Sequence, residues 1–159
     1  MRQTVIATNL DRRQFGIGAA ATVIGAALPA VALAQDKPAP AAWEQAVSKV
    51  LGDAKPIQGK MTIEMPEIAE NGNTVPFTIA VDSPMSDKDY IKAIHVIATA
   101  NPQPGVATFR FTPLAGKASV SSRLRLARTQ DVLSIAEVSD GRFLMDKRNV
   151  KVTIGGCGG

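Results

Sequence analysis

The feature that most constrains the fold is a series of short alternating segments beginning at Met61. Apolar and polar residues alternate in these segments, which is the pattern of β-strands with one buried face. Stretches rich in Asn, Asp, Pro and Gly separate them. The expected strands are residues 61–65, 75–81, 91–99, 106–111, 118–127, 132–138, 142–145 and 150–154. Short strands at about 8–12-residue spacing without intervening helices predict an all-β, immunoglobulin-like antiparallel β-sandwich.

A single short helix is expected before the strands. Trp43, Val47, Val50 and Leu51 fall on one face of a helix over residues 43–51, and Gly52 ends it. Residues 35–42 are rich in Pro and Ala and are interpreted as a linker. The predicted β-sandwich domain therefore covers residues 43–154.

Residues 1–34 have the features of an export signal. Arg12 and Arg13 precede an apolar run, and the small-x-small pattern of residues 32–34 precedes Gln35. The run of about 14 residues is shorter than the roughly 20 that span a membrane. The paired arginines and the apolar run together resemble a twin-arginine signal, although Asp11 stands where Ser or Thr is commoner. We expect a periplasmic protein without stable membrane association after cleavage; an ordinary signal peptide or an N-terminal anchor is the alternative.

Composition excludes several classes of function. The chain has one Cys and one His, which excludes an internal disulfide framework, a Cys-based zinc site and a multi-His metal cluster. We expect no bound metal or cofactor. The net charge of +4 falls to +2 when the predicted signal is removed, and aromatic residues make up 4% of the chain. Both values argue against a nucleic-acid partner.

The C-terminus places the only cysteine between two glycine pairs. Gly155, Gly156, Gly158 and Gly159 surround Cys157 directly after an alternating strand. Glycine carries the largest entropic cost of ordering, so residues 155–159 are predicted to form a flexible, exposed arm. Its extended length would carry the thiol about 10 Å beyond Ile154. No base lies beside Cys157 in the sequence, which favours a covalent carrier over an enzyme; a disordered tail with an incidental cysteine is the alternative.

This ending resembles that of the SoxY family, the sulfur carriers of bacterial thiosulfate oxidation. Further segments resemble the family in the same order: residues 66–72, 75–76, 82–85, 101–102, 123–127 and 139–141. The resemblance implies an exported heterodimer with SoxZ and covalent attachment of sulfur to Cys157. It also implies transient contacts with the cytochrome enzyme SoxAX, the dimanganese hydrolase SoxB and the sulfane dehydrogenase SoxCD. Metals and haem would belong to those partners.

Other reactive side chains have simpler interpretations. His95 is expected on one strand face with Ile91, Ala93 and Ile97, as a hydrogen-bonded structural residue rather than a ligand. Four methionines would be compatible with copper binding: Met61, Met65, Met85 and Met145. Met61 and Met65 share a strand face and most simply fill the core. Three arginines alternate along a strand and are interpreted as a solvated or partner-facing edge: Arg123, Arg125 and Arg128.

Two other functions compete with the covalent carrier. A ubiquitin-like sulfur carrier would use a thiocarboxylate at Gly159, but this would leave Cys157 without a role and conflicts with the export signal. A periplasmic metal-binding module is the third possibility. Mass analysis of the thiol and of the C-terminus distinguishes the first two.

Overall fold

The computed structural model describes residues 41–156. The predicted signal peptide, most of the linker and the last three residues, including Cys157, lie outside this range. No helix within residues 41–156 is long and apolar enough to cross a membrane.

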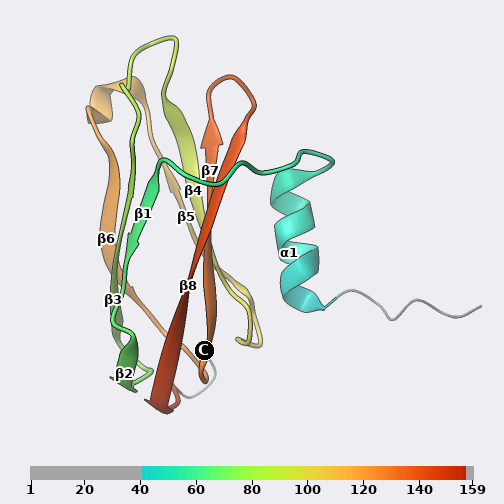
Figure 1. The fold of residues 1–159 in the computed structure, drawn as a ribbon, viewed down its shortest axis with the longest axis vertical. Helices are drawn as coiled ribbons and strands as arrows, with labels where there is room; N and C mark the ends of the chain where they lie inside the picture. Colours follow the sequence, from blue (N-terminus) through green and yellow to red (C-terminus); the bar gives the residue numbers. More distant parts are fainter. Residues whose placement is uncertain (1–40, 157–159) are drawn as a thin grey trace, which may run out of the picture. The chain divides into compact units, whose positions relative to one another are not determined.

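Two β-sheets form the domain (Figure 1). The smaller sheet has the order β1-β3-β6, with β1 (Met61–Glu64), β3 (Val75–Val81) and β6 (Ala118–Leu124). The larger has the order β2-β8-β7-β4-β5. Its strands are β2 (Ile68–Asn71), β4 (Ile91–Ala98), β5 (Gly105–Arg110), β7 (Gln130–Val138) and β8 (Phe143–Ile154). A 3-10 turn, η1 (Pro113–Ala115), precedes β6. The predicted immunoglobulin-like β-sandwich is confirmed.

The core lies between the two sheets and is built from alternate strand positions. In β3, Val75, Phe77, Ile79 and Val81 are buried, while the residues between them are exposed or half-buried. The Phe77 ring packs against that of Phe109 on β5, with ring centroids 6.2 Å apart. Burial of such side chains stabilises the fold by about 1.5–3 kcal/mol each.

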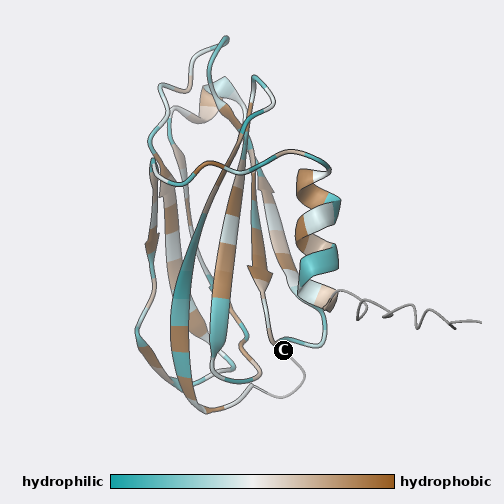
Figure 2. Cartoon of the chain, turned by 45° about the vertical axis from the view of Figure 1, so that its right-hand side comes forward, coloured by the Kyte–Doolittle hydropathy of each residue, from teal (hydrophilic) through white to brown (hydrophobic). Residues whose placement is uncertain are grey.

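The predicted helix is confirmed as α1 (Ala42–Leu51). It packs on the outer face of the larger sheet, where Ile97, Leu133 and Ile135 form a second apolar cluster with the helix. Figure 2 shows the apolar side of α1 turned toward this sheet. No residue of α1 is itself buried, so the helix covers the sheet without entering the main core.

The C-terminal strand differs from the sequence prediction. Two separate strands over residues 142–145 and 150–154 were expected, but β8 is one continuous strand. The polar stretch between them stays paired with β7, from Ser134 opposite Asp146 to Asp131 opposite Asn149. Backbone hydrogen bonding does not depend on side-chain polarity, so exposed polar residues extend the strand without interrupting it.

Two further features were not expected. Strand β2 was not predicted, and it pairs with β8 in parallel, with Ala69 opposite Val152. All the other strand pairs are antiparallel. The pairing of β4 with β7 shifts register between Ile91 and Ala93, and Ile91 joins the main core with Ile94. The expectation that Ile91 shares the face of His95 is therefore wrong, because a bulge reverses the alternation locally.

Candidate functional site

The last residues of β8 carry the chain toward Cys157. Pairing with β7 ends at Val150, opposite Gln130, and pairing with β2 begins at Lys151. Beyond Val150, a side chain replaces the backbone of β7 as the hydrogen-bond partner of β8: the Thr129 hydroxyl accepts a hydrogen bond from the Val152 N–H at 2.9 Å. The strand is therefore held on both sides almost to its end.

Three backbone segments then meet in a chain of hydrogen bonds. The Gly72 N–H donates to the Ile154 carbonyl at 2.8 Å, and the Leu126 N–H donates to the Gly72 carbonyl at 2.8 Å. The Gly156 N–H in turn donates to the Leu126 carbonyl at 2.9 Å. We call Gly155 and Gly156 the arm root. These bonds fix the arm root between the turn after β2 and the segment after β6.

Glycine is required here for close packing. A Cβ atom on Gly72 would overlap the Leu126 carbonyl oxygen and lie 2.7 Å from the Gly156 nitrogen. A Cβ on Gly155 would overlap the Ala127 carbonyl oxygen, and one on Gly156 would lie 2.9 Å from the Gly72 oxygen. These neighbours are backbone atoms and cannot rotate away, so all three positions need the smallest residue.

A buried polar network holds the segment that supports the arm root. The Asn101 side chain donates to the Arg125 carbonyl at 2.9 Å and accepts from the Ala127 N–H at 3.0 Å. It also accepts from the Gln130 amide at 2.8 Å, and Gln130 in turn accepts from the Ala100 N–H. Asn101 and Gln130 are both buried. Buried amides with satisfied partners define one backbone arrangement, which places Leu126 where Gly156 can bind it.

The structure describes only the first two residues of the predicted carrier arm. Gly155 and Gly156 are described, and Gly156 is buried against the domain. Cys157, Gly158 and Gly159 lie outside the described residues, as do Arg12 and Arg13 of the predicted signal. The flexible arm over residues 155–159 stays a prediction. The structure adds that Gly156 is hydrogen-bonded to Leu126 and that Gly155 and Gly156 both pack closely against neighbouring backbone.

Sequence reasoning did not identify the residues that hold the arm root. Residues 71–73 and 101–105 were interpreted as turns, and residues 66–72 and 101–102 also as segments that resemble the family, without a role in holding the arm. Gln130 received no interpretation. The glycine and asparagine signals were visible, but the atoms that they contact come from distant parts of the chain.

Exposed arginines surround this end of the domain. Arg123, Arg125 and Arg128 are exposed, as the solvated-edge interpretation expected. Only Arg123 lies on a strand, because β6 ends at Leu124; the expected continuation of this strand to residue 127 is wrong. Within residues 41–156 none of the three forms an ion pair.

Asp131, on the nearby part of β7, has other partners: its carboxylate accepts hydrogen bonds from Asn149 at 2.7 Å and from Lys147 at 3.1 Å. These hydrogen bonds lower the pKa of Asp131, so it remains a carboxylate engaged with other partners.

His95 lies away from the arm root, on the outer face of the larger sheet. Its Nδ1 is 3.0 Å from the Thr108 hydroxyl, so the expected hydrogen bond is present. Partial burial lowers the pKa of His95, Glu137 opposes this effect, and Arg110 adds to it. Within residues 41–156 no three His, Cys, Asp or Glu side chains gather as a metal site would need.

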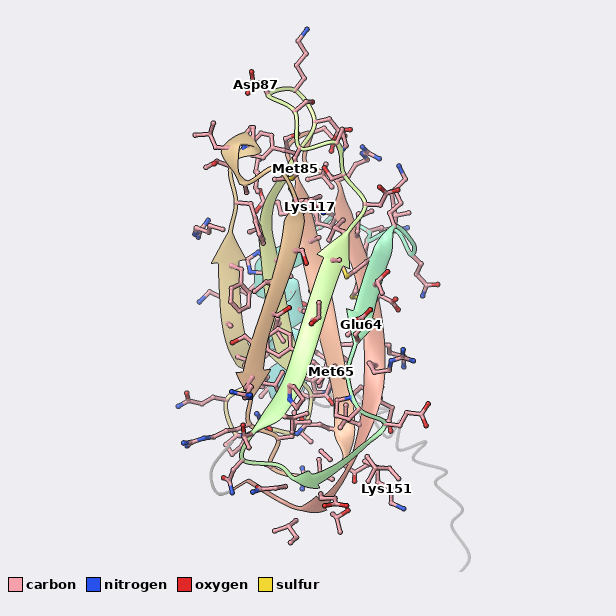
Figure 3. All side chains as sticks on the ribbon, turned by 90° about the vertical axis from the view of Figure 1, so that its left-hand side faces the viewer. Glu64, Met65, Met85, Asp87, Lys117 and Lys151 are labelled. Atoms are coloured by element: carbon pink, nitrogen blue, oxygen red, sulfur yellow. The ribbon has the colours of Figure 1, made fainter. Side chains whose placement is uncertain are left out.

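The methionines occupy core or partly buried positions. Met61 and Met85 are buried in the main core, and Met65 packs against it. Met145 packs against the second cluster beneath α1. Met85 and Met65 lie at different heights of the sandwich (Figure 3). The core-filling prediction for Met61 and Met65 is confirmed.

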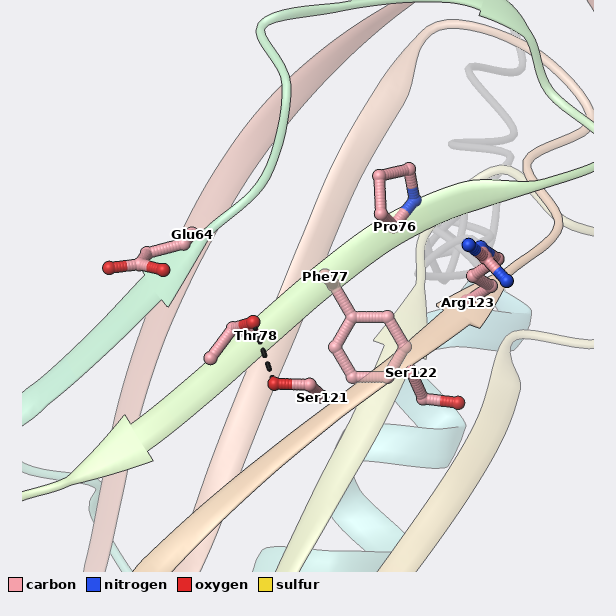
Figure 4. A pocket seen from close by; sticks show the side chains of 7 residues that line it. All are labelled: Glu64, Pro76, Phe77, Thr78, Ser121, Ser122 and Arg123. Atoms are coloured by element: carbon pink, nitrogen blue, oxygen red, sulfur yellow. Dashed lines mark hydrogen bonds between the residues drawn. The ribbon is translucent and has the colours of Figure 1, made fainter.

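The outer face of the smaller sheet carries a shallow polar pocket (Figure 4). Thr78 and Ser121 share a hydrogen bond of 2.9 Å at its centre. Glu64 and Arg123 also line it (Figure 4), and no ion pair joins them in the described part of the chain. The hydroxyls of Thr78 and Ser121 are hydrogen-bonded to each other. The described residues of this pocket therefore offer no nucleophile as reactive as the thiol of a cysteine.

A comparison with family models identifies residues 47–157 as "Sulfur oxidation protein SoxY". The chain belongs to the SoxY family. Among solved structures it is similar to the sulfur carrier protein SoxY from Chlorobium limicola f thiosulfatophilum, with 33% identity and a TM-score of 0.59. That match covers 70% of this chain and 96% of the other. No curated protein matches the chain.

The fold is shared more widely than the family. Superoxide reductase (neelaredoxin) from Ignicoccus hospitalis is similar with a TM-score of 0.53, at 17% identity over 59% of this chain and 80% of that one. At this identity the likeness shows a common sandwich architecture alone. The SoxY family match, in contrast, extends through the arm root to residue 157.

Proposed function

We propose that this protein is a carrier that holds sulfur intermediates covalently on Cys157 and presents them to separate enzymes. The observation that carries the proposal is the family match, which ends at the cysteine itself. The 33% identical relative is a sulfur carrier protein. Cys157 is the only thiol of the chain and stands between two glycine pairs, so it has no intramolecular cysteine with which to form a disulfide.

The chemistry of loading follows from the reactivity of a thiolate. A disulfide-type bond forms between Sγ of Cys157 and the outer sulfur of thiosulfate, and two electrons leave to an acceptor. Family resemblance assigns that oxidation to the cytochrome enzyme SoxAX. Water then cleaves the terminal sulfonate as sulfate, in the step assigned to SoxB, and a persulfide stays on Cys157. SoxCD, where present, oxidises this sulfane sulfur by six electrons with water to a sulfonate. A second hydrolysis frees the thiol.

The arm root suits a carrier. Its contacts are backbone hydrogen bonds and glycine packing, and none of the side chains that hold it is a general acid or base. A thiol without a neighbouring base depends on its partner enzymes for activation. This favours a covalent substrate carrier and argues against an independent enzyme.

Location and partners belong to the same proposal. Arg12 and Arg13 would direct export through the twin-arginine pathway to the periplasm, after which no stable membrane association is expected. Because that pathway exports folded chains, a SoxZ partner without its own signal would cross in complex with this chain. Contacts with SoxAX, SoxB and SoxCD would be transient, because each enzyme must release the arm to the next. No nucleic acid is expected among the partners.

Intact-mass measurement tests the carrier function. The purified protein is incubated with thiosulfate and the partner enzymes, and we expect the mass of one thiosulfate unit on Cys157, removable by a thiol reductant. The Cys157→Ser variant should stay unmodified under the same conditions. Absence of any adduct on the native protein would overturn the proposal, as would a mass change confined to Gly159, which is the signature of a thiocarboxylate.

A further inference from the structure

A polar groove of about 370 Å³ opens beside the arm root. Its walls come from the turn after β2, the turn between β4 and β5, and the end of β6. The side chains that give it hydrogen-bonding character are Asn73, Gln103, Arg123 and Arg125. None of the described residues that line the groove carries a carboxylate.

The arm root packs against a residue that lines this groove. A Cβ atom on Gly156 would lie 3.2 Å from the backbone nitrogen of Asn73, which lines the groove. Gly156 also donates to the carbonyl of Leu126, the residue directly after Arg125. Cys157 follows Gly156 in the chain, so its Cα lies about 3.8 Å from that of Gly156. A group attached to the thiol is therefore tethered one residue beyond Gly156, which packs against the groove residue Asn73.

The donors in the groove have no competing partners. Within residues 41–156 no ion pair or hydrogen bond engages the side chains of Asn73, Gln103, Arg123 or Arg125. Asn101 also lines the groove, but its side-chain oxygen accepts two hydrogen bonds and its amide nitrogen donates one in the network described above. Two guanidinium groups and two amides, exposed to water and unopposed by negative charge, match the oxygens of an anionic group.

We propose that this groove is an anion subsite that binds the terminal sulfonate of the group carried on Cys157, with Arg123 and Arg125 as its charged ligands. This inference rests on the proposed carrier function. The thiosulfate conjugate ends in a sulfonate, with three equivalent oxygens and a negative charge. Bidentate arginine contacts would hold that end beside the domain until a partner enzyme takes the arm. The persulfide lacks these oxygens and would be held less strongly.

Chemical loading tests the subsite without partner enzymes. The Cys157 thiolate attacks a sulfenyl sulfur of tetrathionate: a new S–S bond forms, the central S–S bond breaks, and thiosulfate leaves with the electron pair. The product carries the same sulfonate-terminated group as the proposed conjugate. A neutral adduct of similar attachment, the methyl disulfide made with methyl methanethiosulfonate, serves as the reference.

Nuclear magnetic resonance then reports where the charge lies. We expect the Nε–H signals of Arg123 and Arg125 and the Gln103 amide to shift in the tetrathionate product and not in the methyl disulfide. Free thiosulfate added to Cys157→Ser at the protein concentration should give about a tenth of that shift or less, because it lacks the effective concentration of a tethered group. Equal shifts for the two adducts would overturn the proposal. Shifts of the same size with free thiosulfate would also overturn it, because the ligand of the groove would then be a free anion and not the group carried on Cys157.

Reaction rates give an independent measure. The double variant Arg123→Gln/Arg125→Gln should react about 5- to 20-fold more slowly with dianionic tetrathionate at low salt, and within about 2-fold of the native rate with neutral iodoacetamide. Lys88→Gln/Lys117→Gln removes the same charge from exposed positions and should leave both rates within about 2-fold. Lys117 lies at the opposite end of the sandwich from Lys151 (Figure 3).

Two rate results would contradict the subsite. Equal slowing with both reagents would indicate a changed thiol rather than anion recognition, and unchanged tetrathionate rates would exclude a role for the arginines. Neither measurement uses thiosulfate loading by partner enzymes. Failure of enzymatic loading would therefore count against the carrier function while leaving the anion subsite to be judged by these experiments.

Discussion

The backbone N–H of Gly156 donates to the carbonyl oxygen of Leu126 at 2.9 Å, directly before the cysteine. This bond shortens the free part of the predicted arm. An arm free from Gly155 onward would carry the thiol about 10 Å beyond Ile154, whereas an arm held at Gly156 leaves one peptide unit before Cys157. Release of one such bond costs about 0.5–1.5 kcal/mol, so a partner enzyme that binds the extended arm can readily offset it.

Gly72 is predicted to be essential for the arm root. Gly72→Ala should lower the free energy of unfolding by about 1–3 kcal/mol, because the new Cβ would press on the Leu126 carbonyl and the Gly156 nitrogen. Urea denaturation measures the loss. Gly105→Ala is the matched control, since a Cβ there meets no atom within 4 Å. Similar losses in the two variants would show that the packing at Gly72 is unimportant.

Asn101 is predicted to stabilise the segment that holds the arm. Asn101→Ala removes the side-chain partner of the Ala127 N–H and of the Arg125 carbonyl, and one of the two acceptors of the Gln130 amide, which keeps the Arg128 carbonyl. The expected loss is about 2–4 kcal/mol of unfolding free energy, with faster hydrogen exchange at the Ala127 amide. Gln103→Ala, an exposed substitution in the same turn, should change stability by less than about 0.5 kcal/mol. Unaltered exchange at Ala127 would count against the network.

Ser134 is predicted to be replaceable. Its Oγ is buried and has no hydrogen-bond partner within the described residues. Ser134→Ala should leave the free energy of unfolding unchanged or raise it by up to about 1 kcal/mol, because an unpaired hydroxyl loses its hydration on burial. Ser119→Ala, on the exposed side of β6, gives the background effect of the same substitution. A clear loss at Ser134 alone would reveal a partner for the hydroxyl.

His95 is predicted to make stability depend on pH. Its pKa in the folded protein lies below the ordinary value of 6.5, mainly because of burial. The unfolded chain therefore binds the proton more readily. Stability is complete above pH 6.5 and falls as the pH drops through 6.5 toward the lower folded pKa. Since His95 is the only histidine, His95→Gln should flatten the dependence of unfolding free energy on pH in this window. An identical slope in the variant would refute this assignment.

Arg12 and Arg13 are predicted to direct export. Replacing both with Lys keeps their charge but removes the arginine pair, so the precursor should accumulate in the cytoplasm. Cell fractionation with immunoblotting measures precursor and processed protein. Arg2→Lys makes the same exchange outside the motif and should be exported normally. Normal export of the double variant would favour an ordinary signal peptide.

The local sequence was sufficient to predict an element wherever the spacing of its apolar side chains reflects one buried face. Alternation in Val75 to Val81 predicted β3, and the apolar spacing from Trp43 predicted α1, because each pattern reflects contact with a single apolar surface. The position of Cys157 between glycines was likewise visible in the chain and led to the carrier hypothesis. Strand β2 gave no comparable signal: only Ala69 of its four residues is buried, and its pairing with β8 is made by backbone atoms.

The sequence by itself determined the sandwich class, the helix and the residue proposed to carry sulfur. Tertiary structure alone decided that Gly72, Leu126 and Gly156 meet, that Asn101 holds the supporting segment, and that Arg123 and Arg125 line a groove beside the arm root. The physical reason is the range of the interactions. Periodicity records which face of a local element is buried, whereas close backbone contacts depend on how strands distant in the sequence are packed together.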